Sequence, residues 1–262
     1  MGYTTEAYLI SCLTNMHVGS GGANYGVIDN LVQRDSISNM PVIHSSSLKG
    51  ALREFFKNNW GEGDDKLNYI FGPDGARDES SKSKEGIGHY KFFPADLLVL
   101  PVRSNKKPFF RATAKMLVDT INEKAKVFKV KALKDGILFP DNCDLTNTAN
   151  NNFVLLEDWK AHIDPTISTN PNFGDNIVGF DDDTFKKLAK KLPVIARNQL
   201  DNGESKNLWY EEVVPRESRF VFFVAKDREY AGEFDKEFKD SVVQIGANAS
   251  IGYGYVTITK IT

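Results

Sequence analysis

The chain carries the same local pattern near its start and near its end: a strand, a helix and a second strand. This repetition constrains the fold more than any other feature. In the first unit, the apolar run 7–13 predicts a strand. Apolar residues from Leu48 to Phe56 then recur at intervals of three and four residues, which predicts an amphipathic helix that follows capping serines and ends near Trp60 and Gly61. The apolar run 95–102, ended by a proline, predicts a buried second strand.

The second unit repeats this order. Residues 220–225 predict a strand, Phe234, Phe238 and Val242 have the four-residue spacing of a helix, and residues 253–261 predict a final strand. Two such units give a β-α-β-β-α-β core in which an antiparallel sheet packs its helices on one face. We therefore expect an α+β fold.

The middle of the chain is less regular and predicts insertions into this core, at about 61–90 and 135–185. The first includes a polar loop at 72–88, and the second is rich in Asn and Asp. A helix is expected at 113–126. Residues 192–214 predict a β-hairpin around Asn202-Gly203, a favoured tight turn, although a connection longer than two residues is also open. A single domain over residues 1–262 accommodates all of these elements.

The charges are sorted along the chain, although the formal net charge is only −2. Residues 102–134 hold ten Lys and Arg against two acids, whereas residues 135–185 hold ten acids against one Lys. Such blocks are often merely solvated faces, but a basic block is also typical of a groove that binds a phosphate backbone. The net charge therefore does not exclude a nucleic-acid partner.

Several classes of protein are not expected. Cys12 and Cys143 form no CxxC pair, and the four histidines have no metal-ligand spacing, so a zinc site is improbable. The glycine-rich stretch 17–30 fits neither the dinucleotide fingerprint nor the P-loop. Without a basic leader or an apolar run of roughly 18 residues, a cytoplasmic protein with no membrane partner is expected.

Six stretches in this order resemble the RAMP superfamily of CRISPR systems, most closely the backbone subunit of the type III-B, or Cmr, effector complex. They are 14–21, 26–35, 45–53, 95–104, 208–212 and 245–255. The resemblance implies an RRM-like (ferredoxin-like) palm with an inserted β-hairpin thumb. It also implies copies stacked along a guide RNA with other Cmr subunits, and target RNA cut at regular intervals in a divalent-metal-dependent reaction. The basic block would then face the guide, and the acidic block would face elsewhere, toward neighbouring subunits.

The resemblance also assigns candidate catalytic residues. Asp29 matches the family's catalytic aspartate, although an Asp in a Gly/Asn-rich loop is usually a turn residue. RNA carries its own nucleophile, the 2′-hydroxyl, so one carboxylate can suffice, as a base or as a ligand of Mg²⁺ or Mn²⁺. His17 and Glu211 are placed nearby by their motifs. Their alternatives are a structural histidine and, for Glu211 and Glu212, an exposed strand edge protected by charge.

A second group of residues is expected to bind the RNA backbone. Ser46, Ser47 and Lys49 lie at the start of the first helix, where free backbone N–H groups and a cation favour a phosphate, and Arg53, one turn further on, extends this site. Gly252 and Gly254 fit a loop that approaches RNA closely, or else a β-bulge. This glycine loop lacks the basic residue that the family often carries there, so its phosphate contact is expected to be through the backbone.

Two other functions remain open. One is an RNA-binding scaffold with the same fold but no cleavage; the presence of Asp29 favours the enzyme. The other is a metal-independent RAMP endonuclease that processes precursor guide RNA, with His17 and His44 as its acid and base. Cleavage of repeat RNA that resists EDTA would support this last alternative.

Overall fold

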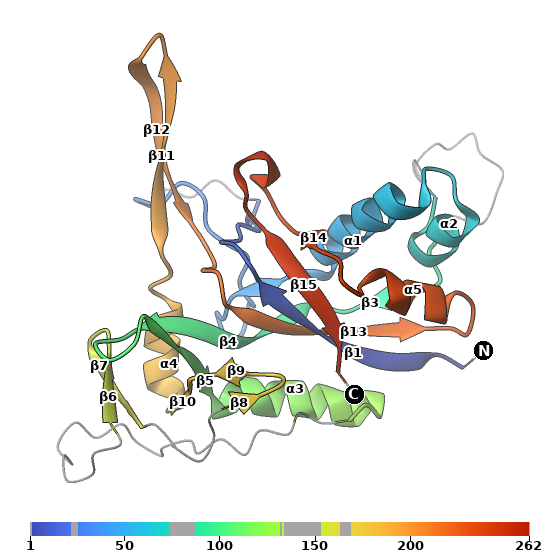
Figure 1. The fold of residues 1–262 in the computed structure, drawn as a ribbon, viewed down its shortest axis with the longest axis horizontal. Helices are drawn as coiled ribbons and strands as arrows, with labels where there is room; N and C mark the ends of the chain where they lie inside the picture. The colour runs from blue at the N-terminus through green and yellow to red at the C-terminus, as the bar shows by residue number, and fades with distance from the viewer. Residues whose placement is uncertain are drawn as a thin grey trace.

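The computed structural model describes residues 2–21, 26–73, 87–131, 133, 153–162 and 169–261. Its centre is a sheet of four long antiparallel strands in the order β15-β1-β13-β4 (Figure 1). Their bounds are β1 Thr4–Cys12, β4 Ala95–Arg103, β13 Arg219–Lys226 and β15 Tyr255–Lys260. The predicted strands are therefore present and lie side by side, with bounds that differ from the predicted ones by at most three residues.

Shorter strands extend this sheet on both sides. On one side β14 (Val243–Gln244) pairs with β15, and on the other the order continues from β4 through β5, β10 and β7 to β6. The bounds are β5 Phe109–Ala114, β6 Phe153–Leu156, β7 Trp159–His162 and β10 Ile177–Phe180. Because β10 pairs with β5 in parallel, the sheet is mixed. Residues 135–185 therefore contribute strands to the main sheet as well as connections, whereas residues 134–152 lie outside the described residues.

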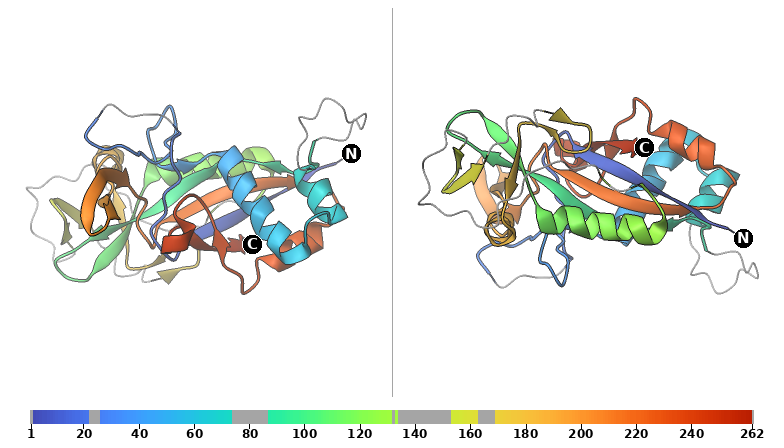
Figure 2. Two further views of the ribbon diagram at one scale, coloured as in Figure 1. Left: turned by 90° about the horizontal axis from the view of Figure 1, so that it is seen from above. Right: turned by 90° about the horizontal axis from the view of Figure 1, so that it is seen from below.

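The described helices cover both faces of the sheet, which corrects the expectation of a single covered face. α1 (Ser45–Trp60), α2 (Asp65–Phe71) and α5 (Ala231–Glu237) lie on one face, and α3 (Lys115–Phe128) lies on the other (Figures 1 and 2). The fifth helix, α4 (Asp182–Ala189), follows β10. α3 begins two residues after its predicted start, because Thr113 and Ala114 belong to β5.

The central strands explain this two-sided packing, because β13 is buried along nearly its whole length. Successive side chains point to opposite faces, so Phe222 packs with Tyr8, whereas Phe223 joins the cluster that contains Val118 and Ile121 of α3. A strand buried on both faces has a continuous apolar run, and this run identifies burial but not which helix covers each face.

Several element ends differ from the predictions. Pro101 lies inside β4 and does not end the strand. The predicted helix with Phe234, Phe238 and Val242 on one face is shorter than expected, because α5 stops at Glu237. Phe234 lies within the helix and is fully buried, whereas Val242 lies beyond it and is half exposed. The polar loop expected at 72–88 falls largely outside the described residues.

A β-hairpin of β11 (Val194–Asp201) and β12 (Glu204–Glu212) projects from the sheet (Figure 1). Its turn has two residues, Asn202 and Gly203, both with positive φ, as the Asn-Gly pair favours. Two smaller elements complete the fold: a ribbon of β8 (Thr169–Asn170) and β9 (Gly174–Asp175), and a 3₁₀ turn at Ala249–Ile251. Two remaining short strands, β2 (Val42–Ile43) and β3 (Lys91–Phe92), pair with β4 and β13.

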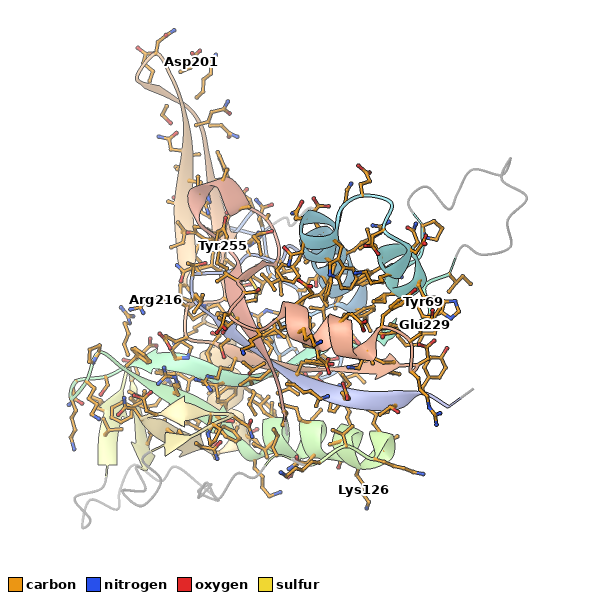
Figure 3. All side chains as sticks on the ribbon, turned by 45° about the vertical axis from the view of Figure 1, so that its right-hand side comes forward. Tyr69, Lys126, Asp201, Arg216, Glu229 and Tyr255 are labelled. Carbon is orange, nitrogen blue, oxygen red and sulfur yellow. The ribbon has the colours of Figure 1, made fainter. Side chains whose placement is uncertain are left out.

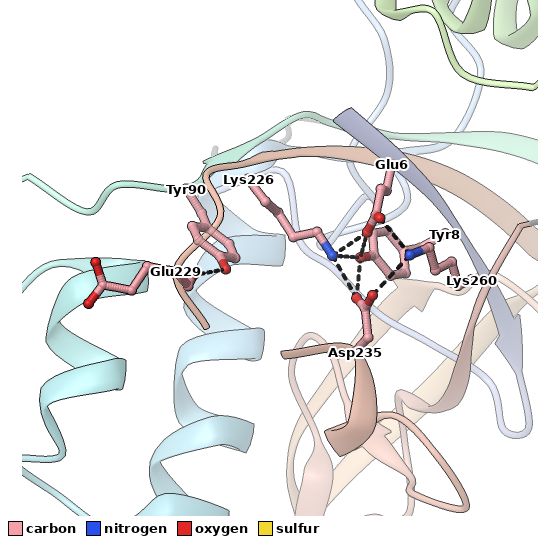
Figure 4. A network of polar contacts seen from close by, with 7 residues as sticks. All are labelled: Glu6, Tyr8, Tyr90, Lys226, Glu229, Asp235 and Lys260. Atoms are coloured by element: carbon pink, nitrogen blue, oxygen red, sulfur yellow. Dashed lines mark hydrogen bonds and ion pairs between the residues drawn. The ribbon is translucent and has the colours of Figure 1, made fainter. Parts of the chain in front are cut away.

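A buried polar network fastens α5 to the sheet (Figure 4). Lys226 is 1% exposed; its Nζ donates to Asp235 at 2.7 Å and to the Tyr8 hydroxyl at 2.8 Å, and it pairs with Glu6. Lys260 bridges the same two carboxylates. A buried charge is tolerated only when it is paired and hydrogen-bonded, and this lysine meets both conditions.

Candidate functional site

Asp29 lies at the foot of the hairpin, docked against β12. Its Oδ2 accepts a hydrogen bond from the Tyr210 backbone N–H at 2.7 Å, and the backbone N–H groups of Asp29 and Asn30 both donate to the Tyr210 carbonyl at 3.1 Å. The residue itself is exposed. Within the described part of the chain, Oδ1 accepts no hydrogen bond, so the carboxylate of this exposed residue is anchored by one oxygen.

His17 is buried, with 5% of its surface exposed, behind the same strand. Its Nδ1 lies 2.7 Å from the Glu212 carbonyl oxygen and, because a carbonyl only accepts, Nδ1 donates in this contact. Its Nε2 faces Gly19, where an added Cβ would lie 3.2 Å away. This setting resembles that of a structural histidine.

Glu211 is only 6% exposed, so the alternative of an exposed, charge-protected strand edge is wrong for this residue and for Glu212, which is 3% exposed. Arg197 Nε donates to it at 2.6 Å, Trp209 Nε1 at 3.0 Å and Asn248 Nδ2 at 3.0 Å. Burial opposes its ionisation, but the hydrogen bonds from Trp209 and Arg197 and the charge of Arg197 outweigh burial and lower the pKa of Glu211. Arg197 also stacks over Tyr253.

The structure therefore brings the three candidate catalytic residues to one end of β12. Asn30, next to Asp29, forms a bridge with Glu211, and His17 contacts the backbone of Glu212. Among the described contacts, no hydrogen bond or ion pair joins the three side chains directly, although a charge on His17 is one of the causes that lower the pKa of Glu211. Asp29 faces solvent, whereas Glu211 and His17 hold the surrounding segments in place.

The start of α1 differs in detail from the predicted serine cap. His44 is the N-cap residue, and its side chain makes no capping hydrogen bond. Ser47 Oγ instead accepts from Gln33 Nε2 at 2.9 Å, and Ser46 is exposed. The first-turn N–H groups of a helix have no partner within the helix, so this end keeps its capacity to bind an anion.

Lys49 lies close to two other cations, Arg53 of the same helix and Lys91 of β3. Partial burial and the positive charges of Lys91 and Arg53 lower the pKa of Lys49. Like charges this close repel one another, and a bound anion such as a phosphate relieves the repulsion. The cluster thus fits the predicted phosphate site at α1.

The two loop glycines serve different purposes. Gly252 has a φ of 83°, is exposed, and has open space where a Cβ would lie. Gly254, in contrast, is buried, and a Cβ there would lie 2.0 Å from the Ile245 carbonyl oxygen. The close approach at Gly254 is to the protein's own backbone, so only Gly252 is open to a ligand.

The basic block is divided between two sides of the molecule. Lys126 of α3 lies on the sheet face opposite the hairpin (Figure 3), and Lys129 directly follows that helix. Arg103, the last residue of β4, instead lines a pocket together with Pro193 and Val194 at the hairpin base. One RNA backbone beside Asp29 cannot contact both groups. Only part of the basic block, and not the whole of it as expected from the sequence, can therefore face the guide.

Three further residues support the site: Gln33, Arg34 and Glu212. Gln33 is buried and joins three segments, donating to Gly19 O and Ser47 Oγ and accepting from His44 N at 2.8 Å. Arg34 Nη2 pairs with Glu212 Oε1 at 2.6 Å. All three lie inside quoted motifs, but their partners are distant in sequence, so local spacing gives no signal for these contacts.

The chain belongs to the RAMP superfamily, whose family model matches residues 9–257. A Cmr endoribonuclease, Cmr4, of Pyrococcus furiosus is 28% identical over 97% of this chain and 95% of its own length. A CMR subunit Cmr4 of Saccharolobus solfataricus is 32% identical over 38% of this chain and 30% of that protein.

Solved structures share the fold. A chain of the type III-B Cmr-beta complex bound to cognate target RNA has a TM-score of 0.76 at 22% identity, covering 98% of this chain and 96% of that one. Oligomeric Cmr4 from Pyrococcus furiosus has a TM-score of 0.67 at 21% identity, covering 98% and 99%. No helix within the described residues is long and apolar enough to cross a membrane.

Proposed function

We propose that this chain is a backbone subunit of a type III-B CRISPR effector that binds guide RNA and cleaves complementary target RNA. The observation that carries this proposal is Asp29, an exposed residue whose carboxylate is held on β12 by one of its two oxygens. A near full-length relative named as a Cmr endoribonuclease supports it. So does a similar chain in a complex with target RNA.

In this proposal, the four central strands with α1 and α5 form an RRM-like palm, and the β11–β12 hairpin is the thumb. The strand order β15-β1-β13-β4 is the order that a β-α-β-β-α-β unit produces. Copies stack along the guide in the cytoplasm together with other Cmr subunits, and the thumb distorts the target beside Asp29. The phosphate site at α1 and the open backbone at Gly252 hold the guide.

The cleavage itself is an attack of a target 2′-hydroxyl on the adjacent phosphate. The bond between the 2′-oxygen and phosphorus forms and the bond from phosphorus to the 5′-oxygen breaks. The leaving 5′-oxygen takes a proton from water, so the products are a cyclic phosphate and a 5′-hydroxyl. Asp29 accepts the hydroxyl proton or orients the attacking group. Buried His17 and Glu211 hold the segments around Asp29.

A divalent cation fits this arrangement only in part. The described residues include no group of three or more His, Cys, Asp or Glu that could hold a metal. Mg²⁺ or Mn²⁺ would therefore rely on Asp29 together with phosphate oxygens and water, a mode of binding usual for Mg²⁺. Such an ion would neutralise charge that develops on the phosphate.

The test is reconstitution of the complex with guide RNA and three substrates: complementary target, non-complementary RNA and repeat RNA, each with and without EDTA. We expect evenly spaced cuts in the complementary target only, abolished by EDTA, with cyclic-phosphate ends. Binding without cuts would favour the scaffold, and EDTA-resistant cleavage of repeat RNA would favour the processing endonuclease. The burial of His17 disfavours that last outcome.

A further inference from the structure

All of the polar groups of Glu212 contact the segments that carry Asp29 and His17. Its backbone N–H donates to the Asn30 carbonyl at 2.9 Å, and its backbone oxygen accepts from His17 Nδ1 at 2.7 Å. Its side chain accepts from the Val32 N–H at 3.2 Å and from Arg34 at 2.6 Å.

Arg34 extends these contacts to a third segment. Its Nη1 donates to the carbonyl oxygens of Asn39, at 3.0 Å, and Ala189, at 2.9 Å, while Nη2 holds Glu212. The guanidinium thus joins the Asp29 segment, the end of α4 and the base of the hairpin. Its planar fork of donors suits three acceptors in fixed positions, which a lysine ammonium cannot match.

Burial makes this ion pair rigid. The Glu212 side chain is 4% exposed and that of Arg34 is 15% exposed, so water competes little for either group. The Asp29 carboxylate, by contrast, is exposed and has one backbone anchor. Asp29 is itself hydrogen-bonded to Tyr210 through its carboxylate and its backbone N–H. The segment 30–34 that follows it is fixed to the base of the same hairpin by Glu212 and Arg34, and so supports the position of Asp29.

We propose that Glu212 and Arg34 are positioning residues for cleavage: their ion pair fixes the segment that presents Asp29 against the hairpin. This inference rests on the proposed function. Because effective catalysis requires reacting groups in register, a displacement of about 1 Å can lower a rate by about 100-fold without loss of substrate binding.

The experiment compares Glu212→Gln and Arg34→Lys in the reconstituted complex with a matched control, Glu62→Gln. Glu62 is an exposed acid that pairs with Lys57. Glu212→Gln keeps the shape of the side chain but removes its charge and one of its two acceptors. Arg34→Lys keeps the charge and loses the fork, and it serves as the second test if the first variant does not assemble.

Four readouts separate positioning from general stability: the single-turnover cleavage rate, the target affinity, the melting temperature of the complex and the positions of the cuts. We expect a rate lowered by about 10- to 100-fold, unchanged target affinity, and additional cuts beside the usual positions. The control should behave as the wild type.

Two results would overturn the inference. One is wild-type rate and wild-type cut positions in both variants. The other is a loss of cleavage that only parallels loss of assembly, with cut positions unchanged. If the wild-type complex itself does not cut, the proposed function fails instead, so the two failures are distinguishable.

Discussion

Two glycines of the same loop differ in what a methyl group would meet. Gly254→Ala places a Cβ against the Ile245 carbonyl, whereas Gly252→Ala meets nothing but must hold a left-handed φ. We expect Gly252→Ala to lower the free energy of unfolding by about 1 to 2 kcal/mol. Gly254→Ala should cost more, because the backbone must move as well. Urea unfolding of the two variants checks this order, and equal losses would contradict it.

The contribution of Glu211 to the fold can also be measured through the free energy of unfolding. Glu211→Ala leaves Arg197 without its carboxylate in a buried setting, so we expect a loss of about 3 kcal/mol in the free energy of unfolding. Glu204→Ala, at the exposed hairpin tip, is the matched control and should change little. A loss no larger than the control's would show that the Glu211 network contributes little to stability.

At the scale of elements, the attachment of α5 to the sheet depends on pH. Burial by itself would raise the pKa of Asp235, but hydrogen bonds from Lys226, Tyr8 and Lys260 outweigh it and lower the pKa. A carboxyl with a lower pKa in the folded state contributes stability that is complete above its unfolded pKa and is lost as the pH falls through its folded pKa. Glu6 has a lowered pKa for similar reasons.

We therefore expect the wild type to lose stability steeply as the pH falls below about 5. Asp235→Asn should be less stable at neutral pH but should show a shallower loss on acidification, because one of the titrating groups is gone. Chemical unfolding at several pH values measures both slopes. Parallel pH profiles of the two proteins would contradict this account of the network.

Elements whose contacts are local in sequence could be predicted, whereas contacts between distant segments could not. The hairpin could be predicted because Asn202 and Gly203 are themselves the turn, and α1 because its apolar stripe is local. The partners of Glu211 could not, since Asn248 reaches it from the C-terminal loop and Arg197 from the other hairpin strand. The parallel pairing of β10 with β5 is similarly non-local. Asp29 could be identified from its motif, whereas the hydrogen bonds that hold it are visible only in the folded structure.

At the scale of the whole molecule, cations on the two faces of the sheet are expected to differ in their contribution to guide binding. Lys49→Gln with Arg53→Gln should weaken guide binding and lower the slope of log affinity against log salt by about 1 to 2, because phosphate contacts release counterions. Lys126→Gln with Lys129→Gln, on the opposite face, should leave both unchanged. Filter binding over a salt series measures the slopes, and equal effects of the two pairs would contradict the assignment of the guide to the α1 face.

The central claim concerns one exposed carboxylate at the foot of a projecting hairpin. Asp29→Asn keeps the size of the side chain and an oxygen that can accept from the Tyr210 N–H, but it removes the charge. The most direct measurement is single-turnover cleavage of complementary target by the reconstituted complex, with guide and target affinity measured on the same samples. We expect cleavage to be abolished while both affinities stay at wild-type values. Cleavage at the wild-type rate by Asp29→Asn would contradict the account.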